Sequence, residues 1–252
     1  MVLRPIGKLI HADTLGNLPR IGRMPHATWH PFLDDLVAQF RKINADDTFS
    51  VALRGSVARG ATTEVAADVD LVVFLDDEAV PFGPVQSNIF PSMPIEMSLI
   101  PRSDFPTHKD WVWMRFALAH GGQTIFGYDH LTKLPEPRLG PHCIAHLRNA
   151  DRWLKQWQTY WDEDHDYLAI CEWLMKRIVR SLFESQLMQM NAYSRDIYPC
   201  SQVAVQAFPN LRQAIMSAAE LAVSPVEDRE IISKITKQLS PILLQKQSEL
   251  KK

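Results

Sequence analysis

Two neighbouring sequence signals for the fold lie between Leu53 and Leu75. The first is Leu53-Arg-Gly-Ser-Val-Ala-Arg-Gly60, in which a Gly-Ser turn follows an apolar segment. The second is Ala66-Ala-Asp-Val-Asp-Leu-Val-Val-Phe-Leu75, in which two acidic residues lead into β-branched and aromatic residues. Such a run predicts a largely buried strand over residues 69–75.

The acidic residues of this stretch, Asp68 and Asp70, are two positions apart, which on a strand places both carboxylates on one face. Two carboxylates on a rigid element suit Mg²⁺ or Mn²⁺, because Mg²⁺ leaves its other positions to water and substrate phosphates. Gly55 and Ser56 add backbone N–H groups that can cradle a phosphate. The sequence therefore predicts a site for a metal ion and a phosphate here.

A third acidic residue lies in the segment Pro94-Ile-Glu-Met-Ser-Leu-Ile-Pro101, where apolar residues alternate with Glu96 and Ser98. The alternation predicts a strand that buries its apolar side and directs Glu96 to the other face. Glu96 joins the site if that face also carries Asp70. On the opposite face it is an ordinary strand carboxylate.

Together, the Gly-Ser turn, the Asp68-x-Asp70 pair and Glu96 resemble the nucleotidyltransferase superfamily, in particular the minimal nucleotidyltransferases and the antibiotic adenylyltransferases. The matching motif lies within residues 50–100. Ala67 stands where family members commonly have Ser. The third acid is Glu, as it is in the antibiotic-modifying branch.

The resemblance implies an α+β chain with a mixed sheet and ATP or another nucleoside triphosphate as substrate. Its phosphates are expected near Gly55 and Ser56, with Mg²⁺ held by Asp68 and Asp70. Glu96 is expected either to act as general base on an acceptor hydroxyl or to bind a second metal ion. The implied product is a nucleotidylated small molecule or an AMP-modified protein side chain, released together with pyrophosphate.

Long helical patterns begin after Pro106 and predict two domains. We expect a nucleotidyltransferase catalytic domain over residues 1–105, including an irregular N-terminal arm, and a C-terminal helical bundle over residues 106–252. Apolar periodicity predicts helices at 28–43, 110–120, 142–161 and 167–190, with shorter helices at 202–208, 211–223 and 226–250. A further strand is expected at 48–54, and residues 124–141 read as a loop.

The predicted helix over residues 167–190 has an apolar stripe that includes Leu174 and Ile178. Its opposite side gathers Lys176, Arg177 and Arg180. In two-domain nucleotidyltransferases the bundle commonly completes the nucleotide site, so the resemblance implies that these cations reach the triphosphate. A solvated basic face is the open alternative. Arg59 has two similar interpretations, as a triphosphate ligand or as a residue that stabilises the turn.

Composition narrows the function further. The chain has 252 residues with 46% hydrophobic content, enough for a substantial core, and its net charge of −2 argues against a polynucleotide substrate.

Three widely spaced cysteines predict neither a disulfide framework nor a zinc ribbon and fit a reducing cytosol. His142 and His146 are four residues apart, but no third zinc ligand accompanies them. We therefore expect a cytoplasmic protein without a membrane partner.

Two other functions stay open at this stage. The fold could belong to a non-catalytic or antitoxin-like protein that binds a partner through its helices. Clustered carboxylates argue against this, because they repel one another and lose hydration when no cation is bound. The second alternative is an RNA nucleotidyltransferase, which the near-neutral charge disfavours. A protein partner or a homodimer, the acceptor and the preferred base all stay undetermined.

Overall fold

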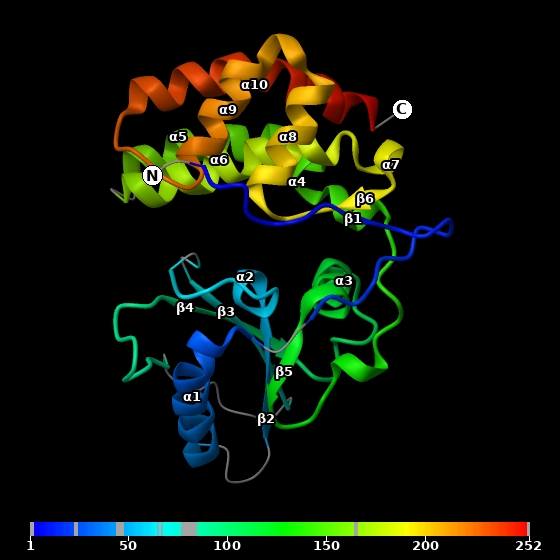
Figure 1. Ribbon diagram of the computed structural model, residues 1–252, viewed down its shortest axis with the longest axis vertical. Helices are drawn as coiled ribbons and strands as arrows, with labels where there is room; N and C mark the ends of the chain where they lie inside the picture. The colour runs from blue at the N-terminus through cyan, green and yellow to red at the C-terminus, as the bar shows by residue number, and fades with distance from the viewer. Residues whose placement is uncertain are drawn as a thin grey trace. The chain divides into compact units, whose positions relative to one another are not determined.

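The computed structural model describes residues 3–22, 25–43, 48–64, 66, 68–76, 85–163 and 166–250. Contacts divide the chain into two compact units, whose ribbons are drawn in Figure 1. The sheet unit runs from Asn17 to Arg138. The helical unit comprises the described residues up to Gly16 together with those from Leu139 onward.

A mixed sheet forms the centre of the sheet unit. Its strands are β2 (Phe49–Arg54), β3 (Val69–Leu75), β4 (Ile95–Pro101) and β5 (Gln123–Phe126). In the described part of the chain they follow the order β4-β3-β2-β5. β2 pairs antiparallel with β3 and with β5, whereas β3 and β4 are parallel. The predicted α+β class with a mixed sheet is confirmed.

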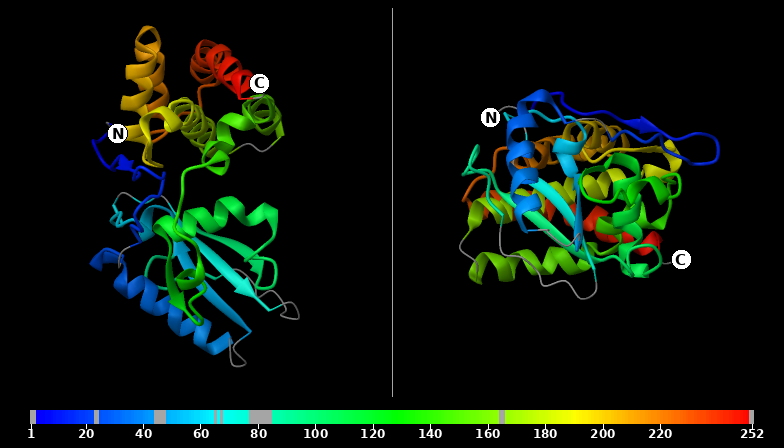
Figure 2. Two further views of the ribbon diagram at one scale, coloured as in Figure 1. Left: turned by 90° about the vertical axis from the view of Figure 1, so that its right-hand side faces the viewer. Right: turned by 90° about the horizontal axis from the view of Figure 1, so that it is seen from below.

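Helices cover both faces of this sheet, as Figure 2 shows for α1 (His30–Ile43) and α3 (Val112–Gly121). The odd-numbered residues of β3, such as Leu71, share one buried cluster with α1 residues such as Phe32. The even-numbered residues Val72 and Phe74 share a second cluster with Leu118 of α3. The strand alternation therefore sorts the side chains of β3 into an α1 face and an α3 face.

Two features of the sheet unit differ from the sequence-based expectations. Residues 123–126 form the strand β5, although 124–141 was predicted as a loop. The structure also places α3 and β5 with the sheet, whereas the predicted division at residues 105 and 106 assigned both to the helical domain. Both elements belong to the sheet unit for physical reasons. The strand β5 forms hydrogen bonds with β2, and α3 buries Leu118 against the sheet.

The helical unit is built around α6 (Tyr167–Glu184), which contacts each of the other α-helices of this unit that are named below. Asp166 begins α6 by accepting a hydrogen bond from the backbone N–H of Ala169 at 3.1 Å. The predicted apolar stripe is buried, since Leu174 and Ile178 are both 0% exposed. The other helices are α4 (Ala145–Arg148), α5 (Ala150–Glu163), α7 (Leu187–Met190), α8 (Ile197–Ala207), α9 (Arg212–Leu221) and α10 (Arg229–Glu249).

Short elements complete the fold. The N-terminal arm joins the helical unit, because β1 (Ile10–His11) pairs antiparallel with β6 (Ala192–Tyr193). The predicted helix over 167–190 is interrupted after Glu184, and α7 ends at Asn191, which has a φ of +47°. The one-turn helices are α2 (Gly55–Ala58) and the 3-10 helices Ala27–Trp29, Lys109–Trp111, Leu131–Lys133, Pro141–Ile144 and Pro209–Leu211.

None of the helices in the described ranges is long and apolar enough to cross a bilayer.

Candidate functional site

A row of three charged side chains crosses the sheet where β2 ends and where β3 and β4 begin. Arg54 of β2 is the register partner of Asp70 in β3, and Asp70 is in turn the register partner of Glu96 in β4. Residues in register project to the same face of a sheet. Leu71, the neighbour of Asp70 in β3, belongs to the cluster on the α1 face. Because neighbouring residues of a strand point to opposite faces, the row lies on the α3 face.

The Gly-Ser turn is packed against this row. Gly55 has a φ of +76°, a left-handed conformation that glycine adopts without strain. A Cβ atom at this position would collide with the carboxylate of Asp70. Both observations explain why glycine follows Arg54, and they bring the turn next to Asp70.

The turn itself is closed by backbone hydrogen bonds. Ser56 is the first residue after Gly55 in α2, and its carbonyl accepts from the N–H groups of Arg59 at 3.1 Å and Ala61 at 3.0 Å. The indole of Trp29 donates to the carbonyl of Ala61 at 2.7 Å and fixes the segment that follows. Ser56 is half-buried, so the turn remains accessible.

Asp68 directly precedes β3. The backbone N–H of Val69 donates to the carbonyl of Pro94 at 2.9 Å, which extends the pairing with the chain before β4 to this point. Asp68 is half-buried, like Asp70. Ala67, which stands at the family's usual serine position, lies outside the described residues.

Arg54 is the site residue to which the sequence analysis gave no role. Its Nη2 lies 2.6 Å from Oδ1 of Asp70, and its guanidinium carbon lies 6.0 Å from the ring centroid of Trp113. Strand pairing could have indicated this contact. The strands β2 and β3 border the motif and pair antiparallel, which brings Arg54 opposite Asp70. Trp113 lies half-buried beside Arg54.

The three carboxylates do not converge into a closed metal site. Within the described ranges, no three His, Cys, Asp or Glu side chains are grouped closely enough to hold a metal ion. The chemistry of the donors nevertheless suits Mg²⁺, which commonly takes only one or two carboxylates and fills its shell with water and phosphate oxygens. Asp70 lies in β3 and Asp68 directly precedes it, so a pair of acidic residues two positions apart borders the turn.

Arg59, the other cation predicted near the turn, lies against the end of α3. A Cβ atom on Gly121 would be 3.4 Å from Cγ of Arg59, so the two residues are in contact. Nearby His120 is 4% exposed, and its Nδ1 lies 2.8 Å from the carbonyl of Pro19. Burial, together with the charge of Arg59, lowers the pKa of His120.

The predicted cationic side of α6 has local partners in the helical unit. Lys176 pairs with Glu172 one turn earlier on the helix. The Nε of Arg180 donates to the carbonyl of Arg195 at 3.1 Å. Arg177 lies over the ring of Trp173 at 4.5 Å, and its Nε is buried without a hydrogen-bond partner among the described residues. A role in binding triphosphate stays a prediction for all three cations.

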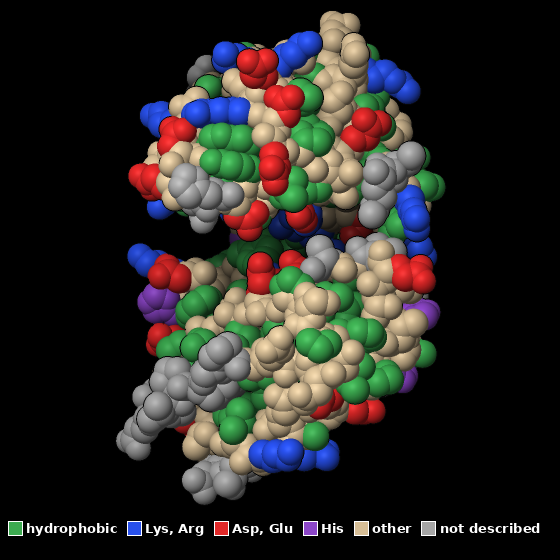
Figure 3. All heavy atoms as spheres, turned by 90° about the vertical axis from the view of Figure 1, so that its left-hand side faces the viewer, with side chains coloured by type: hydrophobic (Ala, Val, Ile, Leu, Met, Phe, Trp, Pro, Cys, Tyr) green, Lys and Arg blue, Asp and Glu red, His purple; other side chains and the backbone are tan. Residues whose placement is uncertain are grey.

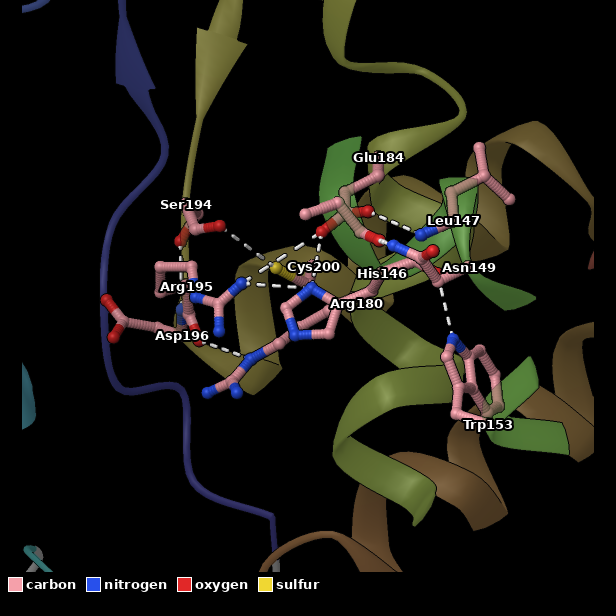
Figure 4. Close-up of polar contacts among 11 residues, drawn as sticks. His146, Leu147, Asn149, Trp153, Arg180, Glu184, Ser194, Arg195, Asp196 and Cys200 are labelled. Carbon is pink, nitrogen blue, oxygen red and sulfur yellow. Dashed lines mark hydrogen bonds and ion pairs between the residues drawn. The ribbon is translucent and has the colours of Figure 1, made fainter. Parts of the chain in front are cut away.

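A buried polar network lies in the helical unit around Glu184, as Figure 4 shows. The two carboxylate oxygens of Glu184 lie 2.7 Å from His146 Nδ1 and 2.8 Å from the backbone nitrogen of Leu147, and both nitrogens donate to them. Arg195 Nη1 lies 3.9 Å from the same carboxylate. Burial, followed by the charge of Arg195, lowers the pKa of His146 to about 4. His146 is thus held by a carboxylate inside the bundle.

Surface charge is mixed. On the face drawn in Figure 3, Lys and Arg side chains are interspersed with Asp and Glu side chains. This agrees with the net charge of −2.

Comparison with known proteins gives a result for the fold. No protein-family model matches the chain, and no curated protein matches it. The fold is nevertheless one found in an antibiotic adenylyltransferase, as the sequence motif predicts. Spectinomycin adenyltransferase AAD(9) from Enterococcus faecialis, solved with ATP and spectinomycin, is similar over 84% of this chain and 98% of that one, with a TM-score of 0.51. Sequence identity is 14%, so the similarity establishes a shared fold.

Proposed function

We propose that this protein is a nucleotidyltransferase that transfers AMP from ATP to a hydroxyl group of a small molecule and releases pyrophosphate. One observation carries the proposal: Glu96 and Asp70 are register partners on adjacent strands, and Gly55 packs on Asp70. The fold shared with spectinomycin adenyltransferase AAD(9) supports it. In that structure the bound molecules are ATP and spectinomycin, which favours a small-molecule acceptor here as well.

The residues of the sheet unit are assigned by their chemistry. Gly55 and Ser56 receive the phosphates through the backbone N–H groups of the turn. Asp68 and Asp70 hold Mg²⁺ or Mn²⁺, with Glu96 as a further ligand if a second ion binds. A bound divalent ion offsets the charge that develops on the phosphate oxygens during transfer.

The acceptor oxygen forms a bond to the α-phosphorus of ATP, the bond from that phosphorus to the bridging oxygen breaks, and pyrophosphate leaves with the electron pair. Glu96 takes the proton from the acceptor hydroxyl. Proton transfer to a positioned carboxylate commonly contributes roughly 10²–10⁴-fold to the rate. The same half-exposed row of charges would have no evident use in a protein that only binds a partner.

The cations of α6 are a separate proposal, as ligands of an anion at the helical unit. Arg177 supports it best, because a guanidinium stacked on an aromatic ring, with an Nε that lacks a partner in the described structure, is suited to an incoming phosphate. Lys176 and Arg180 contribute charge on the same helix.

Transfer of label from ATP tests the proposal. The purified protein is incubated with Mg²⁺ and ATP labelled at the α- or γ-phosphorus, together with small-molecule, protein or RNA fractions of a cell extract. We expect label from the α-position, and none from the γ-position, in a small molecule. Label in protein or RNA would mean that the acceptor is a protein or an RNA and not a small molecule. Transfer of γ-label would indicate phosphoryl transfer. No transfer in any fraction would contradict the proposal.

A further inference from the structure

The pair formed by Arg54 and Asp70 places a cation where the proposed metal ion needs an oxygen. Arg54 Nη2 lies 2.6 Å from Asp70 Oδ1, and the two side chains are 19% and 14% exposed. The other oxygen of Asp70, Oδ2, is directed toward Gly55, whose missing Cβ leaves room for it. One oxygen of Asp70 is therefore held by the guanidinium, and the other is next to the Gly-Ser turn.

The position of Arg54 is weakly fixed apart from this contact. Its guanidinium carbon is 6.0 Å from the centroid of Trp113, at the outer limit of a cation–π contact. Its Nε is buried, and no atom of the described residues accepts a hydrogen bond from it. A buried donor without an acceptor is costly. The arginine thus gains its main stabilisation from a single carboxylate oxygen.

A divalent ion and a guanidinium compete for such an oxygen. Both require the same lone pairs, and two positive groups a few ångströms apart repel each other. An incoming triphosphate changes the balance, because its oxygens offer the guanidinium a new acceptor with charge-assisted, bidentate geometry. The turn that is proposed to receive those phosphates begins at the residue after Arg54.

We propose that Arg54 is the counter-ion of Asp70 in the nucleotide-free protein and that a divalent cation binds Asp68 and Asp70 only as Arg54 moves away from Asp70 toward a nucleoside triphosphate. Arg54 then weakens metal binding without nucleotide and couples the loading of the metal to that of the triphosphate. This inference rests on the proposed function in one respect, since it takes Asp68 and Asp70 as the metal ligands.

Mn²⁺ binding tests the inference without any turnover. The loss of the free Mn²⁺ signal in electron paramagnetic resonance is titrated for the wild-type protein, Arg54→Gln and Arg54→Lys, in the absence of nucleotide. The guanidinium repels a divalent ion bound at the same carboxylate, and this repulsion is removed when an uncharged residue replaces Arg54. We therefore expect Arg54→Gln to bind Mn²⁺ about tenfold more tightly or better, and Arg54→Lys, which keeps the charge, to stay closer to the wild type.

A second titration includes a non-hydrolysable ATP analogue with a methylene group between the α- and β-phosphorus. We expect the wild type to gain more Mn²⁺ affinity from the analogue than Arg54→Gln does, because only the wild type has to displace a counter-ion. Equal or weaker Mn²⁺ binding by a folded Arg54→Gln variant would overturn the inference, as would an equal gain in both proteins.

A control variant separates this result from the proposed function. Asp68→Asn removes a proposed metal ligand without touching the partner of Arg54, and it is combined with Arg54→Gln. Loss of the tight Mn²⁺ site in the double variant supports the inference. If Asp68→Asn abolishes Mn²⁺ binding while Arg54→Gln leaves the affinity unchanged, the metal site stands and only the role of Arg54 is wrong. Tight binding that survives in the double variant places the ion elsewhere and overturns both assignments.

Discussion

The two units use charged side chains in opposite ways. In the helical unit, Glu184 is 5% exposed and both its oxygens lie within hydrogen-bond distance of nitrogen donors, from His146 and the backbone of Leu147. In the sheet unit, Asp68 and Asp70 are half-buried, and Glu96 is exposed at the beginning of the edge strand β4. The first group is enclosed by the fold, whereas the second is partly exposed to solvent.

Under the proposed function, this difference separates charges that serve folding from charges that serve binding. A buried carboxylate is stable only when its hydrogen bonds are satisfied, so Glu184 is expected to matter for stability. A strand carboxylate kept accessible beside a glycine turn adds little to stability and is available for chemistry. Variants of the two groups should therefore affect different measured quantities.

The largest expected effect is on activity. Asp70→Asn should lower the rate of transfer from ATP by roughly 10³-fold, about 4 kcal/mol, because it removes a charge that holds the metal ion. The transfer of α-label measures this. Asp110→Asn, at a side chain that is 69% exposed, is the matched control and should keep full activity. A fully active Asp70→Asn protein would show that the row of charges is not the catalytic site.

The next effect is on stability. Glu184→Ala should lower the free energy of unfolding by about 3–5 kcal/mol, because it removes the carboxylate beside Arg195 and leaves the buried N–H of Leu147 unpaired. Urea denaturation followed by tryptophan fluorescence measures this. Glu249→Ala, which removes an exposed ion pair with Lys246, should cost less than about 1 kcal/mol. Equal costs for the two variants would remove the distinction between enclosed and exposed charges.

The pH dependence of stability follows from His146. Its pKa is about 4 in the folded protein and 6.5 in an unperturbed histidine, so the unfolded chain binds the extra proton between these values. Stability should therefore fall as the pH drops from 6.5 to about 4, by about 3 kcal/mol in all from this residue. His146→Gln should remove this component, whereas His108→Gln, at a half-exposed side chain, should keep it. If His146 instead made the protein more stable as the pH drops from 6.5 to about 4, its pKa would be raised and not lowered in the folded protein.

The smallest effect compares two glycines. Gly55 and Gly60 both have positive φ, +76° and +94°, but only a Cβ at Gly55 would meet another group, the carboxylate of Asp70. Alanine at either position adds backbone strain of about 1–2 kcal/mol. Gly55→Ala should destabilise the protein by about 1–3 kcal/mol more than Gly60→Ala, because it also displaces Asp70. Thermal unfolding of both variants tests this, and equal losses would mean that the turn yields without moving Asp70.

The sequence predicts the central strands well, for a physical reason. The run of apolar residues ending at Leu75 is fully buried and can form little else, so β3 coincides with the predicted residues 69–75. The sequence could not decide whether Asp70 and Glu96 lie on the same face. Strand alternation orders side chains within one strand and does not set the register between two strands. Pairing of β3 with β4 fixes that register.

Other features depend on partners distant in sequence. The strand β5 has four residues, Gln123–Phe126, which is too short for a clear period, although the glycines on either side were a usable signal. The contact between Arg54 and Asp70 depends on the antiparallel register of β2 and β3. The binding of His146 by Glu184 joins residues 38 positions apart, and nothing in their spacing indicates it.

Calorimetric titration with ATP tests the central claim most directly, with and without Mg²⁺, on the wild type and on Asp68→Asn. Asp68 is chosen because Asp70 also holds Arg54. We expect strong ATP binding by the wild type only with Mg²⁺, and we expect Asp68→Asn to lose this dependence. ATP binding that is equal in both proteins, or indifferent to Mg²⁺ in the wild type, would contradict the central claim.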